Sequence, residues 1–192
     1  MSVRWIIVGL IIVAGIGAIV VYGWKPVGLL IAIKLENKSV VHMAQGDHDA
    51  AVRVARRALT VGKWAAGSND PDVALIRLNL ASLLRERGRR DEAQILMERS
   101  LKDMEQAAGL EHPDVALILL QLGALHHDQG QYTQAEPLYE RSLAIWEKVF
   151  GADHPHVATV LEEYADLLRQ TARADEGERM EARAKTIRAK SE

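Results

Sequence analysis

Apolar and polar positions divide the chain into one uninterrupted apolar run near the start and a longer stretch with helical alternation. Residues 5–24 carry no charge, and a helix of these 20 residues at about 1.5 Å per residue spans roughly 30 Å, the hydrocarbon thickness of a bilayer. Trp5 and Trp24 stand at its two ends, where aromatic rings favour the lipid headgroups. The pattern predicts a transmembrane anchor over residues 1–25 that contacts lipid through residues 5–24.

A cleaved signal peptide and a buried core helix are the alternatives for this run. A signal peptide has a shorter apolar core and a polar mature start, whereas residues 19–24 stay apolar behind Gly15 and Gly17. A core helix has a polar face, which this run lacks. We therefore expect a single-pass protein of a bacterial inner membrane, with the side of the remaining domain undetermined.

The predicted anchor contains a pair of small residues four positions apart, Ala14 and Ala18. Small residues at this spacing let two transmembrane helices approach closely. We expect these two positions to pack against another transmembrane helix.

Beyond the anchor, a segment of the sequence repeats with a fixed period. The sequence Pro-Asp-Val-Ala-Leu-Ile begins at Pro71 and again at Pro113, and a partial copy begins at Pro155, each 42 residues after the last. A fixed period of this length indicates stacked structural repeats. It predicts a degenerate first repeat at 26–70, complete repeats at 71–112 and 113–154, and a C-terminal capping repeat at 155–192.

Each complete repeat has the pattern of two amphipathic helices joined by a short turn. In the middle repeat the apolar spacing predicts helices over about 114–129 and 133–150. Gly130 falls between them, and we expect it to adopt the left-handed backbone conformation that often ends a helix. The predicted fold class is all-α.

The middle repeat and the loop after it contain three recognisable motifs: His112-Pro113-Asp114-Val115-Ala116, Gly130-Gln131-Tyr132 and Gly151-Ala152-Asp153-His154-Pro155. These motifs resemble the tetratricopeptide repeat in its longer, kinesin-light-chain-like form. The resemblance covers residues 29–189 and implies an α-solenoid of three to four helix-turn-helix repeats after the transmembrane helix. Lys38, at an expected buried leucine, and Ala172, at an expected turn glycine, depart from the pattern, as capping ends of an array do.

Composition and charge narrow the classes of partner. The chain has no cysteine, which excludes disulfides, thiolate metal sites and cysteine nucleophiles. The net charge of −2 hides an acidic stretch, because residues 103–175 carry 13 acidic and 4 basic side chains. A nucleic-acid binder shows a sustained basic stripe, whereas Arg85 and Arg87 are interspersed with acids. We expect no nucleic-acid partner.

The sequence shows no pattern of catalytic or metal-binding residues. His126 and His127 are adjacent and therefore point in different directions on a helix. Glu162 and Glu163 adjoin without a matching acid at a defined spacing, so no acid/base pair is indicated. We expect no metal, no cofactor and no enzymatic activity.

The resemblance implies a concave groove lined by the first helix of each repeat, apolar near its start and acidic toward its end. The predicted groove residues are Leu75, Leu78, Asn79, Leu117, Leu120, Gln121, His127, Glu162 and Glu163. The alternative for the four leucines is a role in the core between repeats.

These observations predict a membrane-anchored scaffold for protein-protein interaction, an assembly factor or an accessory subunit, whose partners are subunits of a membrane protein complex. The alternative is a structural subunit held mainly by its transmembrane helix, without a peptide-binding groove.

Overall fold

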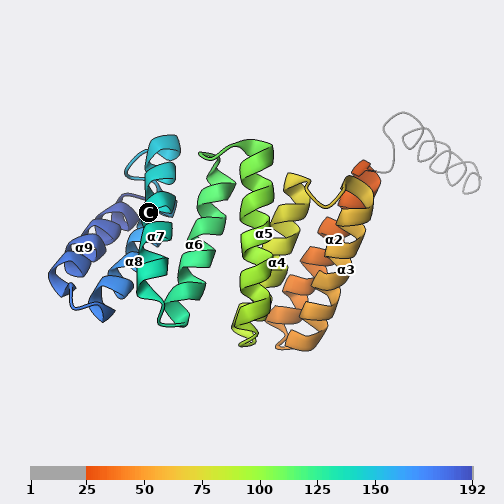
Figure 1. Ribbon diagram of the computed structural model, residues 1–192, viewed down its shortest axis with the longest axis horizontal. Coiled ribbons are helices and arrows are strands. Elements are labelled where there is room, and N and C mark those ends of the chain that lie inside the picture. Colours follow the sequence, from red (N-terminus) through yellow and green to blue (C-terminus); the bar gives the residue numbers. More distant parts are fainter. Residues whose placement is uncertain (1–24, 192) are drawn as a thin grey trace, which may run out of the picture. The chain divides into compact units, whose positions relative to one another are not determined.

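The computed structural model describes residues 25–191, and all regular secondary structure in that range is α-helical (Figure 1). The eight helices there are α2 (Lys25–Ala44), α3 (His48–Ala66), α4 (Pro71–Glu86), α5 (Arg90–Ala108), α6 (Pro113–Asp128), α7 (Tyr132–Phe150), α8 (Pro155–Gln170) and α9 (Ala174–Ser191). The predicted all-α class is thereby confirmed. The two helices predicted in the middle repeat agree with α6 and α7 to within one residue at each end.

The described residues form two compact units, unit 1 (residues 25–76) and unit 2 (residues 77–191), with their boundary inside α4. In unit 1, α2 packs along α3 (Figure 1). A Cβ on Gly28 of α2 would lie 2.2 Å from the Cβ of Ala65 on α3, so only glycine permits this approach. The buried Ser39 hydroxyl donates a hydrogen bond to the Ala51 carbonyl at 2.8 Å and fixes the register of the pair.

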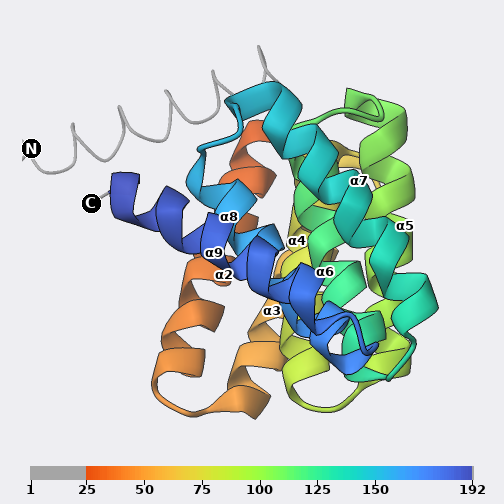
Figure 2. The same ribbon diagram turned by 90° about the vertical axis from the view of Figure 1, so that its left-hand side faces the viewer.

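Unit 2 is built from successive helix pairs. α6 packs on α5, α7 and α8, and α8 packs on α7 and α9, the last contact being visible in Figure 2. Its core includes the fully buried side chains of Leu119, Tyr139 and Leu168. Gly123 lets the Tyr139 ring lie close against α6, because a Cβ at this position would be 2.8 Å from the ring carbon Cε1.

Positive φ angles mark the turn between the helices of each pair. Gly46, Gly88 and Gly130 have φ of 76°, 73° and 72°. This confirms the left-handed conformation predicted for Gly130. Ala172 stands at the equivalent place in the last pair with φ of 60°, and it is the only non-glycine residue with positive φ in the described part of the chain.

Histidines begin two of the helices in unit 2. The Nδ1 of His112 accepts a hydrogen bond from the Asp114 N–H at 3.2 Å, and the Nδ1 of His154 accepts one from the His156 N–H at 3.2 Å. Both side chains satisfy an N–H that the first turn of a helix leaves without an intrahelical partner. These histidines therefore have a structural role.

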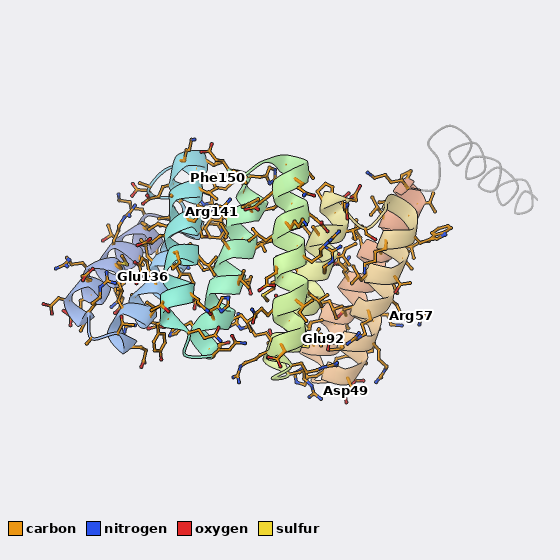
Figure 3. The ribbon with its side chains drawn as sticks, viewed as in Figure 1. Asp49, Arg57, Glu92, Glu136, Arg141 and Phe150 are labelled. Atoms are coloured by element: carbon orange, nitrogen blue, oxygen red, sulfur yellow. The ribbon has the colours of Figure 1, made fainter. Side chains whose placement is uncertain are left out.

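The same set of contacts recurs at two junctions between helix pairs in unit 2. Arg141 on α7, labelled in Figure 3, pairs with Glu105 at 2.6 Å and donates to the Leu110 carbonyl at 3.2 Å. One repeat later, Arg183 on α9 pairs with Glu147 at 2.6 Å and donates to the Ala152 carbonyl at 3.1 Å. A lysine closes each junction, through the pairs Lys148 with Glu111 and Lys190 with Asp153.

The predicted localisation as a single-pass membrane protein needs correction. Within residues 25–191, no helix is long and apolar enough to cross a membrane. α2 has the necessary length, but Lys34, Glu36 and Lys38 lie along it, and charged side chains are costly in hydrocarbon. The predicted anchor at residues 1–24, including Ala14 and Ala18, lies outside the described residues.

Candidate partner-binding site

Three polar residues occupy equivalent repeat positions on the first helices of successive pairs in unit 2. Asn79 on α4, Gln121 on α6 and Glu163 on α8 are separated by 42 residues each. Asn79 is exposed, and the other two side chains are half-buried. We call the surface that bears Asn79, Arg85, Gln121, Asp128, Glu163 and Asp166 the polar face of unit 2.

An arginine joins two helices across this polar face. The Arg85 Nε on α4 donates to Asp128 Oδ2 on α6 at 2.7 Å, and its Nη1 donates to Gln121 Oε1 at 3.4 Å. Arg85 is half-buried, so water screens the ion pair less than it would a fully exposed one.

Glu163 has an unusual environment on the polar face. Among the described residues its carboxylate makes no salt bridge and no hydrogen bond. Burial is the main cause that raises the pKa of Glu163, and the charges of Asp166 and Asp128 act in the same direction. Arg85 and His127 oppose the increase without cancelling it.

The hydroxyl group of Tyr139 on α7 is buried without a hydrogen-bond partner in the described part of the chain. The side chain is fully buried between α6 and α8. Burial raises the pKa of this phenol, and the charge of Glu163 is the next largest cause. Because buried polar groups are nearly always paired, this hydroxyl needs an explanation.

The structure separates the predicted groove leucines into two groups. Leu78 and Leu120 are buried, with 3% and 5% of their surface exposed, which favours the core alternative for both. Leu75 and Leu117 are half-buried. The groove role of the four leucines stays a prediction.

In unit 1, Leu75 lines an apolar pocket of about 410 Å³ together with Pro26, Leu29, Leu30, Ile33, Glu36, Asp72 and Ile76. Leu30 and Ile33 are about half exposed. The α2 side of this pocket is not among the predicted groove residues, all of which lie beyond the degenerate first repeat. The signal was present in the spacing of Leu29, Leu30 and Ile33, which share one helix face.

Glu162 and His127, two further predicted groove residues, are half-buried and contact neighbouring side chains. Glu162 accepts two hydrogen bonds from Arg188, at 3.2 and 3.0 Å. The His127 ring lies beside the Tyr132 ring, with centroids 5.6 Å apart. Glu162 thus forms an ion pair with α9, whereas Glu163 does not.

Comparisons with known proteins agree with this architecture. A protein-family model described as tetratricopeptide repeat matches residues 30–106 and 114–190. No protein with a curated description matches the sequence. The solved structure of BtubC (BKLC) from P. vanneervenii is similar with a TM-score of 0.75 and 20% identity, covering 84% of this chain and 65% of that one. This chain therefore spans just under two thirds of the length of BtubC.

Two further solved structures show the same fold. A kinesin light chain with nearly identical TPR-like repeats from P. anserina has a TM-score of 0.69 at 21% identity, covering 83% of this chain and 76% of that one. MamA has a TM-score of 0.57 at 15% identity, covering 83% and 80%. At these identities the likeness concerns the fold alone. Because the family model matches most of the sequence, this chain belongs to the tetratricopeptide repeat family, whose fold is a scaffold for protein-protein interaction.

Proposed function

We propose that this chain holds a linear segment of a partner protein on the polar face of unit 2, as an assembly factor or accessory subunit of a multiprotein complex. The observation that carries this proposal is the row formed by Asn79, Gln121 and Glu163, one on each first helix. An amide side chain offers both a donor and an acceptor to the backbone of an extended segment. Asn79 and Gln121 carry such amides, and a row of polar groups at a regular interval suits a chain that runs across the helices.

The apolar pocket in unit 1 supports the same function. Leu30, Ile33 and Leu75 offer partly exposed apolar surface there, and burying such surface contributes about 25 cal/mol per Å² before the costs of association. We propose that this pocket takes an apolar side chain of the partner. The chain then acts by binding and not by catalysis.

We also propose that residues 155–192 cap the array, with 26–70, 71–112 and 113–154 as the preceding repeats. The last helix, α9, has acidic residues in its first turn and basic residues in its last turn, which suits the helix dipole. Ion pairs of Arg169 with Glu181 at 2.7 Å and of Arg188 with Glu162 at 3.0 Å hold α9 against α8. A charged last helix is the property that keeps the end of a repeat array soluble.

Photo-crosslinking in the native cell tests the proposed function. A benzophenone amino acid replaces Asn79 on the polar face in the full-length chain, and the control replaces Lys102, which is exposed on α5. We expect a protein adduct of defined mass from position 79 and little or none from position 102. Equal yields from the two positions, with the same adducts, would contradict binding at the polar face.

A further inference from the structure

We infer that Glu163 captures a lysine or arginine side chain of the bound segment and so selects partners with a basic residue at one position. This inference rests on the proposed function and adds the chemistry of the partner. It concerns a residue that departs from the amide side chains at the two equivalent positions, Asn79 and Gln121.

The acids around Glu163 already have basic partners. Asp128 pairs with Arg85 at 2.7 Å, Asp166 pairs with Arg169, and the neighbouring Glu162 pairs with Arg188 at 3.0 Å. Within residues 25–191, Glu163 is the carboxylate of this group that no cation pairs with directly. A half-buried carboxylate without a paired cation is stabilised more by binding a cation than an exposed carboxylate is.

Comparing the repeats shows why Glu163 has no arginine of its own. Arg85 reaches Gln121 from the preceding helix pair. One repeat later, the equivalent positions are His127 and Glu163. The shorter imidazole of His127 lies beside Tyr132 and makes no salt bridge to Glu163 in the part of the chain that the structure describes. The repeat position that bonds to a guanidinium at Gln121 therefore has no internal guanidinium bonded to it at Glu163 among the described residues.

The charge of Glu163 also acts on a buried group, the phenol of Tyr139. The Tyr139 hydroxyl is buried and has no hydrogen-bond partner in the described residues. After burial, the charge of Glu163 is the largest cause that raises its pKa. An ammonium or guanidinium group carries several donors. A cation at Glu163 can thus donate to the carboxylate through more than one N–H.

Selection of peptides on the full-length chain tests this inference. A displayed library of random linear peptides is selected on the parent, on Glu163→Gln, and on Glu178→Gln as an exposed control on α9. We expect lysine or arginine at a fixed place in the peptides selected by the parent and the control, and loss of this preference with Glu163→Gln. Circular dichroism verifies that each variant is folded.

A selected peptide is then made with its arginine replaced by citrulline, the neutral analogue. The parent should lose about tenfold in affinity for the citrulline peptide, the effect of one charge-assisted hydrogen bond, whereas Glu163→Gln should bind both peptides alike. Glu163→Lys should prefer the peptide in which glutamate replaces the arginine. Selected peptides without a basic residue, or equal loss in parent and Glu163→Gln, overturn the role of Glu163 alone. Failure to select any peptide contradicts the proposed function as well.

Discussion

Ala172 stands 42 residues after Gly130 and adopts the same left-handed backbone conformation, with φ of 60° where Gly130 has 72°. A side chain in this conformation costs about 1–2 kcal/mol, and glycine avoids that cost. We predict that Ala172→Gly stabilises unit 2 by about 1 kcal/mol, because the greater freedom of glycine in the unfolded chain offsets part of the gain. Urea unfolding of parent and variant measures the difference, and a lower midpoint for the variant would show that the strain is absent.

The reverse change at Gly130 should destabilise the protein. A Cβ there meets nothing within 4 Å, so the whole cost comes from the backbone conformation. We predict a loss of about 1–2 kcal/mol for Gly130→Val and a smaller loss for Gly130→Asn, since asparagine tolerates positive φ. Equal melting temperatures of Gly130→Val and the parent would be inconsistent with the turn described here.

Gly123 and Tyr139 should behave as a coupled pair. A Cβ on Gly123 would lie 2.8 and 2.9 Å from two carbons of the Tyr139 ring, and overpacking of this kind typically costs about 1–3 kcal/mol. The preceding repeat has Ala81 and Met97 at the equivalent positions. We predict that Gly123→Ala destabilises and that adding Tyr139→Met restores most of the loss in a double-mutant cycle. Additive losses in the cycle would mean that the two sites do not interact.

The pH dependence of stability should report on Glu163. Its pKa in the folded protein lies above the ordinary value of 4.5. Such a carboxyl group stabilises the fold at pH below 4.5, and this contribution is lost as the pH rises through the folded-state pKa. Glu163→Gln should therefore be more stable than the parent at pH 7, and the two should converge near pH 4. Urea unfolding between pH 4 and 8 measures this, with Glu178→Gln as the control that should follow the parent.

The period of the sequence predicted the fold because certain residues of each repeat restrict the backbone to one conformation. Pro113 at a helix start and Gly130 at a turn restrict the backbone directly, so their spacing locates both helices of the middle repeat. The site was harder to predict. α6 is apolar on nearly every side, so its hydrophobic pattern does not separate Leu120, which is buried, from Leu117, which is partly exposed.

The ion pairs of the candidate site could not be predicted from the sequence either. Arg85 bonds to Asp128 from 43 residues away, and no local spacing rule selects that acid over Glu86 or Glu163. The environment of Glu163 depends on this choice, because Arg85 is committed to another carboxylate. The predicted membrane localisation depended on residues 5–24 alone, and the helices that the structure describes did not support it.

The junctions made by Arg141 and Arg183 have a consequence for how the gene can change. Each unit of 42 residues carries an arginine that pairs with the preceding unit and a glutamate that pairs with the following unit. On α7 these two residues are Arg141 and Glu147. A tandem duplication of residues 113–154 would therefore bring both halves of these junction contacts and join to the old sequence without new mutations there. We expect such an insertion to fold as a longer array, whereas an insertion of half a unit would leave each end without its counterpart.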